Sequence, residues 1–488
     1  MALKLKDPSL LKADSYVNGE WTGAKSGARF PVTNPATGEV IAEMPNFDPD
    51  DVTAAIEVAN AAWPAWRAKT AKERAGLMRA WFNLIMANQE DLAQIMTAEQ
   101  GKPLAEKRGE VAYGASFIEW FAEEGKRIYG DVIPTFAQGK RILVFKEPIG
   151  VVAAVTPWNF PNAMITRKAA PALAAGCTFI IKPPSETPLS ATALAELAHR
   201  AGIPKGVINV VTSKQASKVG KVLTESPLVR KFTFTGSTEI GKILMAQCAS
   251  TVKKVSLELG GNAPFIVFDD ADLDAAADGA MISKFRNMGQ TCVCANRLLV
   301  QDGVYDAFAK KLAERVSKMK VGNGVEDGVT QGPLINMAAV DKVESLLADA
   351  KSKGGKVVAG GKRHALGGTF FEPTIVTDVN TDMTIAREEI FGPVATLFRF
   401  KDEAEAVRMA NDTEYGLAAY FYTRDIGRTI RVAEALEYGI VGINEGIIST
   451  EMAPFGGIKE SGIGREGSKY GIEDFLEIKY VLLGGIGV

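Results

Sequence analysis

The sequence predicts an α/β protein with two lobes, and three observations support this fold class. The chain has 488 residues, more than one hydrophobic core normally serves, so two or three domains are expected. Between residues 149 and 258, short apolar runs alternate with stretches long enough for helices, and a second such series begins at residue 263. Repeated βα units of this kind are typical of a parallel, doubly wound sheet with helices on both faces.

The strands of the first lobe are expected at five apolar runs, residues 150–156, 178–182, 207–211, 231–235 and 255–259. Helical patterns dominate before residue 130. One predicted helix has Asp48 as its N-cap and Pro49 as its first residue, a combination that favours helix initiation. Its apolar face consists of Ile56, Ala59, Trp63 and Trp66.

The second lobe is expected to repeat the alternation. Strands are predicted at residues 263–268 and 297–301, and helices up to residue 286 and over residues 304–318. Later strands are predicted near Val394, Ala418 and Val441.

Two further runs, residues 141–146 and 478–483, are rich in apolar and β-branched residues and lie outside both series. Exposed strand edges pair readily with another chain, so these runs predict a small β excursion that joins subunits into a dimer or tetramer. The alternative is that both are ordinary strands within one subunit.

The composition narrows the possible partners. The chain has 56 basic and 58 acidic residues without a long run of like charge, which gives no reason to expect nucleic acid or a membrane as partner. It shows neither a signal-peptide pattern nor a long apolar segment, so a cytoplasmic protein is expected. Four cysteines and two histidines favour neither a disulfide framework nor a metal site. A small-molecule partner is therefore expected.

Cys292 and Glu258 offer a thiol nucleophile and a carboxylate base in one chain. Cys292 lies in a short loop near the start of the second lobe, and Glu258 ends the last strand of the first. Both are expected to face one cleft. The two histidines, His199 and His364, lie in segments without other chemical features, so a Cys–His pair is not expected. The Cys–Glu pair suggests covalent catalysis on a carbonyl.

The sequence gives less evidence of a chemical role for the other three cysteines. A small buried cysteine is common in protein cores, and Cys177 and Cys248 are interpreted as packing residues. Cys294 lies two residues from Cys292, where a disulfide would close a strained and labile loop. The hypothesis is reversible oxidative inactivation through this pair; an inert Cys294 is the alternative.

Two glycine-containing segments are candidates for binding a nucleotide phosphate. The G-x-G-x-x-G pattern at Gly462–Gly467 does not follow a predicted buried strand, so it is interpreted as a glycine-rich loop. At Gly236 and Ser237 an apolar strand turns into a helix, whose N-terminal amides can meet an anion. Such turns also serve as plain connections.

These features together resemble the aldehyde dehydrogenase superfamily. The resemblance rests on six segments in order, residues 157–161, 182–186, 234–237, 257–261, 289–292 and 388–393. It implies that Cys292 is the nucleophile, Glu258 the base and Asn159 an oxyanion donor. It also implies a nicotinamide cofactor, for which the candidate binding residues are Trp158, Lys182, Ser185, Gly236, Ser237, Glu389 and Phe391.

The resemblance suggests a division of the chain. Residues 1–130 and 148–258 are assigned to a cofactor-binding domain and residues 259–455 to a catalytic domain. Residues 131–147 and 475–488 are assigned to oligomerisation strands, and residues 456–474 to a returning segment.

The chemistry of three residues agrees with the implied roles. A thiolate that adds to an aldehyde creates an oxyanion, which the Asn159 amide and the Cys292 backbone N–H can stabilise. After hydride transfer, Glu258 can deprotonate the water that hydrolyses the thioester. Asn159 taken alone is also a common turn residue before a proline such as Pro161.

The cofactor prediction depends on the residues after the strand that ends at Lys182. In this family the position of Ser185 often holds a glutamate that binds ribose hydroxyls and repels a 2′-phosphate. Here the position is neutral and Lys182 adds a positive charge, so NADP is predicted to be preferred. The neighbouring carboxylate of Glu186 argues against this preference, and efficient use of NAD is the alternative.

The substrate prediction depends on Arg167, Arg286 and Ser449. Both arginines lie close in sequence to candidate catalytic elements, and two guanidinium groups suit a carboxylate. Residues 289–297 and 448–457 look like those of succinate-semialdehyde dehydrogenases, in which the corresponding arginines and serine hold the distal carboxylate. The alternative is that the arginines lie on solvated helix faces.

The expected activity is NADP-dependent oxidation of succinate semialdehyde to succinate. Three rivals are a dehydrogenase for a longer substrate such as glutarate semialdehyde, a CoA-acylating relative, and a non-catalytic binding protein. Glu258 argues against acyl transfer to a thiol, because that step needs no water-activating base.

Overall fold

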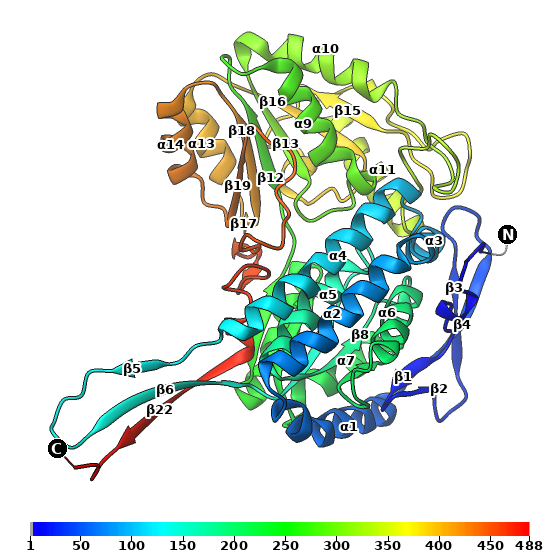
Figure 1. The fold of residues 1–488 in the computed structure, drawn as a ribbon. Helices are drawn as coiled ribbons and strands as arrows, with labels where there is room; N and C mark the ends of the chain where they lie inside the picture. The colour runs from blue at the N-terminus through cyan, green and yellow to red at the C-terminus, as the bar shows by residue number, and fades with distance from the viewer. Residues whose placement is uncertain (1–2, 488) are drawn as a thin grey trace.

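The computed structural model describes residues 3–487, and two mixed sheets dominate it (Figure 1). The first sheet has the strand order β2-β1-β9-β8-β7-β10-β11-β21. Its five central strands run parallel: β7 (Val151–Val155), β8 (Thr178–Lys182), β9 (Ile208–Val210), β10 (Val229–Thr235) and β11 (Lys254–Glu258). All five predicted strands are present, and the order runs outward in both directions from β7, as in a doubly wound sheet.

The edges of this sheet are antiparallel. They are β1 (Ser15–Val17), β2 (Glu20–Thr22) and β21 (Gly462–Ile463), while β3 (Arg29–Thr33) and β4 (Val40–Pro45) form a separate hairpin. The prediction of helices before residue 130 is therefore wrong for residues 15–45. These strands are only three to six residues long, too short for their alternation to stand out in the sequence.

Helices cover both faces of the first sheet. They are α1 (Pro49–Arg67), α2 (Ala71–Ala87), α3 (Gln89–Gln100), α4 (Leu104–Glu124), α5 (Ala163–Ala175), α6 (Pro188–Arg200), α7 (Ala216–Glu225) and α8 (Thr238–Cys248). Val152 and Ala154 of β7 pack with α2 to α6, while Val151 and Ala153 pack with α1, α7 and α8. The strand is thus buried on both sides, which explains its continuous apolar run. Asp48 caps α1 as predicted.

The second sheet has the order β14-β15-β16-β13-β12-β18-β19. Its strands are β12 (Ala263–Val267), β13 (Ala295–Gln301), β14 (Lys356–Ala359), β15 (Thr374–Thr377), β16 (Val394–Phe400), β18 (Ala418–Tyr422) and β19 (Ile440–Ile443). All neighbours are parallel except β14 and β15. Its helices are α9 (Leu273–Phe285), α10 (Tyr305–Val316), α11 (Met337–Ser352), α12 (Thr384–Arg387), α13 (Glu403–Asn411) and α14 (Ile426–Ala435). The predicted second α/β series is confirmed.

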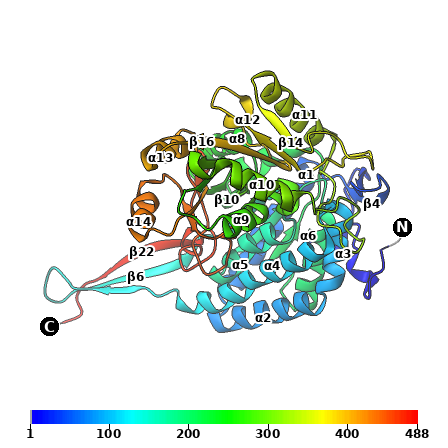
Figure 2. The same cartoon turned by 90° about the horizontal axis from the view of Figure 1, so that it is seen from above.

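A three-stranded arm projects from the body of the molecule (Figure 1 and Figure 2). It consists of β5 (Asp131–Ile133), β6 (Arg141–Pro148) and β22 (Leu476–Leu483), in the order β22-β6-β5. The two runs predicted as excursion strands are therefore paired with each other. Their role in oligomerisation stays a prediction, and residues 1, 2 and 488 of the predicted ranges lie outside the described residues.

The returning segment forms a separate two-stranded sheet and then adds an edge strand to the first sheet. Its strand β20 (Ile458–Lys459) pairs with β17 (Tyr415–Gly416), and β21 pairs with β11 so that Gly462 lies opposite Glu258. No helix within residues 3–487 is long and apolar enough to cross a membrane.

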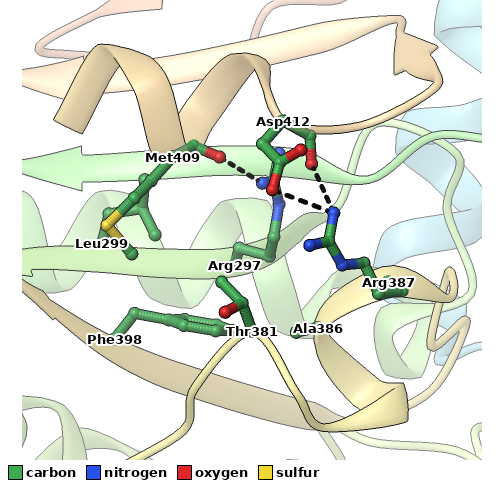
Figure 3. Close-up of a pocket in the computed structure, with 8 residues that line it drawn as sticks. All are labelled: Arg297, Leu299, Thr381, Ala386, Arg387, Phe398, Met409 and Asp412. Atoms are coloured by element: carbon green, nitrogen blue, oxygen red, sulfur yellow. Dashed lines mark hydrogen bonds and ion pairs between the residues drawn. The ribbon is translucent and has the colours of Figure 1, made fainter. Parts of the chain in front are cut away.

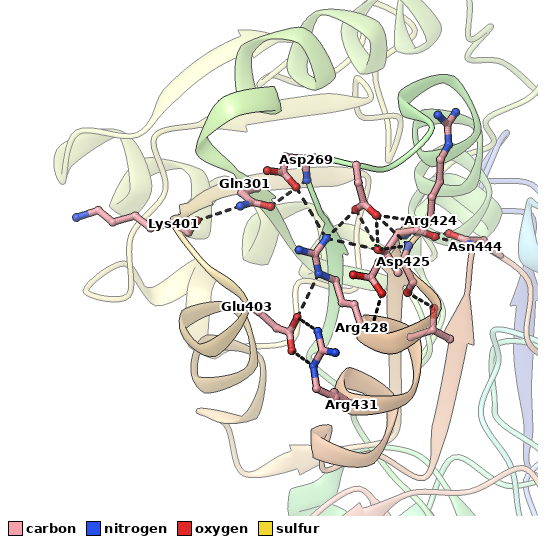
Figure 4. Close-up of polar contacts among 12 residues, drawn as sticks. Asp269, Gln301, Lys401, Glu403, Arg424, Asp425, Arg428, Arg431 and Asn444 are labelled. Atoms are coloured by element: carbon pink, nitrogen blue, oxygen red, sulfur yellow. Dashed lines mark hydrogen bonds and ion pairs between the residues drawn. The ribbon is translucent and has the colours of Figure 1, made fainter.

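A network of ion pairs closes the carboxyl end of the second sheet (Figure 4). Arg428 of α14 donates to Asp270 at 2.8 Å and to Glu403 at 3.2 Å, and its guanidinium carbon lies 4.5 Å from the Phe268 ring centroid. Because the charged groups satisfy one another and fasten α14 to the ends of β12 and β18, we interpret the network as structural. The amino end of this sheet holds the candidate site.

Candidate active site

The candidate site lies where the carboxyl end of the first sheet meets the amino end of the second. Glu258 ends β11, and Cys292 lies three residues before β13 begins at Ala295. The chain passes so closely here that a Cβ atom on Gly261 would lie 2.5 Å from the carbonyl oxygen of Cys292. The glycine allows this approach, and the predicted meeting of the two segments is confirmed.

The Cys292 thiol is partly buried and lies among charges of both signs. Burial, together with the negative charges of Glu389 and Glu258, raises the pKa of this thiol to about 12, and Arg167 opposes the shift. The thiol is therefore protonated at neutral pH in the absence of cofactor and substrate. A nearby base or a change in these charges is needed to produce the thiolate.

The Glu258 carboxyl group is 4% exposed. Burial raises its pKa well above the usual value and Glu466 adds to the effect, whereas Arg167 and Lys168 oppose it. Its Oε2 atom has no hydrogen-bond partner within residues 3–487. A buried carboxyl group with a raised pKa and a free oxygen can act as a general base for water near neutral pH.

Asn159 presents a side-chain amide next to the Cys292 loop. Its Nδ2 atom donates to the carbonyl oxygen of Gln290 at 3.0 Å, which leaves the second N–H of the same group for another acceptor. The carbonyl oxygen of Asn159 in turn accepts hydrogen bonds from Lys102 Nζ at 3.0 Å and Asn287 Nδ2 at 3.1 Å. Asn159 is thus held on both sides and can stabilise an oxyanion.

The turn that leads to Cys292 has a strained backbone. Asn287 and Met288 have φ angles of 53° and 57°, followed by Gly289 at 72°, a conformation that costs free energy in non-glycine residues. The Asn287 N–H donates to Glu106 at 3.0 Å, and its Oδ1 atom accepts from Gln100 at 2.9 Å. These contacts hold the turn in place, and nothing in the sequence singled out these three polar residues.

Buried charged residues on α4 and just before it help to hold Asn159 in place. Lys102 lies 3.0 Å and Lys107 3.2 Å from Glu110 Oε2. Lys102 also lies 3.5 Å from the centroid of the Phe160 ring, and burial lowers the pKa of its ammonium group to about 7. Two lysines and a glutamate within nine residues were visible in the sequence, but nothing local indicated that they are buried.

Arg167 lies inside the protein and not on a solvated helix face, so that alternative is wrong for this residue. It is 2% exposed, lies 2.7 Å from Glu466 Oε2, and stacks 4.0 Å above the Phe455 ring. The neighbouring Lys168 bonds the other Glu466 oxygen and donates to Thr233 at 3.1 Å.

Glu466 belongs to the G-x-G-x-x-G segment. The segment interpreted as a glycine-rich loop forms the short strand β21 at Gly462–Ile463 and a turn after it, and its lack of a role in cofactor binding stays a prediction. Nothing in the sequence singled out the Glu466 carboxylate, which Lys168 and Arg167 keep ionised by lowering its pKa despite burial.

Arg286 and Ser449 lie on two separate loops that meet near α4. The guanidinium carbon of Arg286 is 5.3 Å from the Phe160 ring centroid, and Arg286 forms no ion pair within the described residues. Burial raises the pKa of Tyr113, whereas the positive charges of Arg167 and Arg286 and a hydrogen bond with the Ser449 side chain lower it. The three residues predicted to bind substrate are therefore all near one phenol.

The predicted phosphate turn has the expected geometry. Ser237 caps α8, and its Oγ atom accepts from the Ile240 N–H at 3.4 Å. At the carboxyl ends of β7 and β10, the buried hydroxyl groups of Thr156 and Thr235 have no partner within the described chain. Unpaired donors at the switch point of a doubly wound sheet fit a dinucleotide.

Lys182 and Ser185 follow β8 on the same edge of the sheet. Lys182 is 5% exposed; burial lowers the pKa of its ammonium group to about 8, although Glu186 opposes the shift. Ser185 donates to Glu186 at 3.2 Å. A positive charge and a hydroxyl group thus lie at the position expected for the adenosine ribose.

Glu389 and Phe391 lie on a fixed loop beside Cys292. Glu389 accepts from the Gly261 N–H at 3.2 Å, and burial raises the pKa of its carboxyl group to about 7. The Phe391 ring meets Trp158 edge-on at 5.6 Å. This arrangement can hold a nicotinamide ring and its ribose next to the thiol.

Asn296 of β13 anchors that loop, because its Oδ1 atom accepts from the Ile390 N–H at 3.0 Å. The next residue, Arg297, donates to the carbonyl oxygen of Asn262 at 3.0 Å and, as Figure 3 shows, to that of Met409 at 2.6 Å. The small pocket around Arg297 is therefore interpreted as part of the framework.

Cys294 is buried, and all four cysteines are free thiols. Its Sγ atom donates to the carbonyl oxygen of Lys284 at 3.6 Å, and burial raises its pKa. The proposed disulfide with Cys292 stays a prediction.

Comparisons with known proteins agree with this geometry. A model described as the aldehyde dehydrogenase family matches residues 21–481. Glutarate-semialdehyde dehydrogenase of Pseudomonas aeruginosa is 66% identical over 484 residues, which cover 99% of this chain and 100% of that protein. Succinate-semialdehyde dehydrogenase [NADP(+)] of Escherichia coli is 65% identical over 482 residues, with coverage of 99% and 100%. A crystal structure of succinate-semialdehyde dehydrogenase from Burkholderia pseudomallei has a TM-score of 0.98 and 63% identity, and covers 99% of this chain and 100% of that one.

Proposed function

Because this chain belongs to the aldehyde dehydrogenase family and is an NAD(P)-dependent enzyme of it, we propose that it oxidises succinate semialdehyde to succinate with NADP. The observation that carries the proposal is that Arg167, Arg286 and Ser449 all lie near the Tyr113 phenol, while the buried Arg167 also lies near the Cys292 thiol. Arg167 is already paired with Glu466, so Arg286 is the freer cation. Two guanidinium groups near a carbonyl-binding site suit a short aldehyde with a distal carboxylate.

The proposed reaction is covalent. The Cys292 sulfur adds to the aldehyde carbon, and the oxyanion accepts hydrogen bonds from the Asn159 amide and the Cys292 backbone N–H. A nicotinamide cofactor, which Trp158, Glu389 and Phe391 would hold beside the thiol, would supply the acceptor for the hydride that leaves the adduct to give a thioester. Glu258 then takes a proton from water, whose oxygen attacks the thioester and releases the acid and the thiol.

The cofactor preference rests on Lys182 and Ser185. No carboxylate occupies the position of Ser185 itself, and the buried Lys182 ammonium can attract a 2′-phosphate. Glu186, which accepts the Ser185 hydrogen bond, reduces this advantage. We expect a higher kcat/KM with NADP than with NAD; the reverse order would refute the preference.

Glutarate semialdehyde is the second candidate substrate. The relative from Pseudomonas aeruginosa bears that name at an identity almost equal to that of the succinate-semialdehyde dehydrogenase. Both substrates have a distal carboxylate, so the arginine pair suits either one. Rates with the two semialdehydes decide between them.

We also propose that the arm pairs with a second copy of the chain. Its outer strands β22 and β5 have unpaired edges within the sheet order β22-β6-β5. Four apolar side chains on these two strands are 43 to 75% exposed: Val132, Ile133, Ile478 and Tyr480. Sedimentation analysis should show a dimer or tetramer, and a monomer at micromolar concentration would refute the assignment.

The test of function is a comparison of initial rates with succinate semialdehyde, glutarate semialdehyde and butanal, each with NADP and NAD. Butanal has the chain length of succinate semialdehyde without its carboxylate. Loss of a charged hydrogen-bonded contact should lower kcat/KM for butanal by on the order of 2 to 4 kcal/mol in transition-state terms. Equal rates for butanal and the semialdehydes would refute the proposal.

A further inference from the structure

Tyr113 lies on α4 at the point where four segments of the chain meet. Its ring packs against Phe160 and Met164 and meets Phe117 edge-on at a centroid distance of 5.1 Å. The next residue, Gly114, lets α4 approach α5 so closely that a Cβ atom there would lie 2.6 Å from Asn162 Oδ1. The phenol is therefore held against the helix that carries Arg167.

The loop that carries Ser449 is fastened to the same part of α4. Ser116 Oγ donates to the Tyr113 carbonyl oxygen at 2.8 Å and to Glu451 Oε2 at 3.1 Å. Glu451 is two residues from Ser449, so this contact fixes the loop beside Tyr113. Arg286 approaches from the Cys292 side, where its guanidinium group lies over Phe160.

The Tyr113 hydroxyl group has one candidate partner within residues 3–487, the Ser449 side chain, which lies close enough to lower the pKa of the phenol through a hydrogen bond. Its oxygen is shielded from solvent, and no described residue meets it at full hydrogen-bond geometry. Burial has the larger effect and raises that pKa, so the group stays protonated and can donate. Buried donors in folded proteins are normally paired, and the contact with Ser449 falls short of full geometry, which points to a ligand as the acceptor of the phenol O–H.

We propose that Tyr113 recognises the substrate, its phenol O–H donating a hydrogen bond to the distal carboxylate that Arg167 and Arg286 attract. This inference rests on the proposed function. A carboxylate in this position would lie near the Arg167 and Arg286 cations and the neutral Tyr113 hydroxyl group. The hydrogen bond from Tyr113 would fix the orientation of the carboxylate, which ionic attraction alone does not do. Tyr113 would then help to distinguish an acidic aldehyde from a neutral one.

The test is Tyr113→Phe, measured with succinate semialdehyde and butanal at saturating NADP. Loss of one hydrogen bond to a charged group should lower kcat/KM for the semialdehyde about ten- to hundredfold, mainly through KM. The value for butanal should stay within about twofold of the wild type. Tyr470→Phe, at an exposed tyrosine, is the matched control and should change neither rate.

Thermal unfolding separates recognition from a structural role. Removal of a buried hydroxyl group that makes no hydrogen bond at full geometry should leave the Tm of the substrate-free protein unchanged or raise it. Tyr113→Phe with a lower Tm and a parallel loss of both rates would overturn the inference, as would an unchanged preference for the semialdehyde. If the wild type itself does not prefer the semialdehyde over butanal, the proposed function fails and this inference fails with it.

Discussion

The Nζ atom of Lys102 lies 3.0 Å from the carbonyl oxygen of Asn159. The same ammonium group is paired with Glu110, which Lys107 also contacts. A buried lysine thus connects the charged residues of α4 to the amide that faces the Cys292 loop. The two lysines share one carboxylate, but only Lys102 reaches Asn159.

We expect Lys102→Met to lower kcat about ten- to hundredfold. Loss of the hydrogen bond to the Asn159 carbonyl oxygen leaves the oxyanion donor less well positioned, which should raise the activation free energy by roughly 1 to 3 kcal/mol. Lys107→Met is the control, since it removes the other lysine from the same carboxylate. Both variants should lose stability of several kcal/mol from the broken buried pair. Chemical denaturation should show that the two variants are destabilised equally. Steady-state kinetics on the folded proteins should show a lower kcat for Lys102→Met than for Lys107→Met, and an equal loss of kcat in both would contradict this prediction.

Glu258→Gln should stop the reaction at the thioester. The variant can still form the covalent adduct and transfer hydride, so rapid mixing should give a burst of about one reduced cofactor per subunit and a turnover about a hundredfold or more slower. Absence of the burst would place Glu258 earlier in the reaction.

The same carboxyl group sets a pH dependence. Its pKa is raised above the usual value by burial and by Glu466, and only the ionised form can accept a proton from water. Deacylation should therefore slow as the pH falls through the raised pKa and reach a plateau above it. Single-turnover thioester hydrolysis over a pH series measures this, and a rate independent of pH between 5 and 8 would count against Glu258 as the base.

Glu389→Gln should make the Cys292 thiol more reactive in the cofactor-free enzyme. After burial, Glu389 has the largest effect among the groups that raise the pKa of this thiol, and the carboxylate is mostly ionised at pH 8 because its own pKa is about 7. Removing the negative charge lowers the thiol pKa, and alkylation by iodoacetamide should accelerate about three- to tenfold. Glu388→Gln, at the exposed neighbour, is the control and should alkylate like the wild type.

Ser185→Glu should reverse the cofactor preference. The new carboxylate would lie next to Glu186 and repel a 2′-phosphate, while it could bind the ribose hydroxyls of NAD. The ratio of kcat/KM for NADP over NAD should fall at least about tenfold, with Ser185→Ala as the control for loss of the hydroxyl group. An unchanged ratio would show that the phosphate lies elsewhere.

Oxidation tests the proposed link between Cys292 and Cys294. Wild-type enzyme inactivated by mild peroxide should regain activity with dithiothreitol, because a strained disulfide is easily reduced. Cys294→Ala should be inactivated without recovery, since a lone thiol oxidises beyond the reversible stages. Equal recovery of the two proteins would leave Cys294 as a packing residue.

The sequence was sufficient to predict the central parallel strands of both sheets, but not the antiparallel edge strands or the polar framework around the site. Strands β7 and β12, for example, are continuous apolar runs, which local composition reveals. Lys102 contacts Asn159, 57 positions away, and Glu466 contacts Arg167, 299 positions away. The burial of these two charged residues depends on such distant partners, and no local sequence pattern indicates it. The left-handed turn at Asn287 and Met288 was equally hidden, because neither residue is a glycine.

The segment after residue 456 contributes to the first sheet, to the candidate site and to the arm. It adds β21 to the first sheet, supplies Glu466 to Arg167 and Lys168, and then continues into β22 of the arm. A protein that ended at residue 455 would still contain Cys292, Glu258 and Asn159. It would nevertheless leave two buried cations without their counter-ion and β11 with an open edge, so a fragment that retains all three reacting groups should not be regarded as an active enzyme.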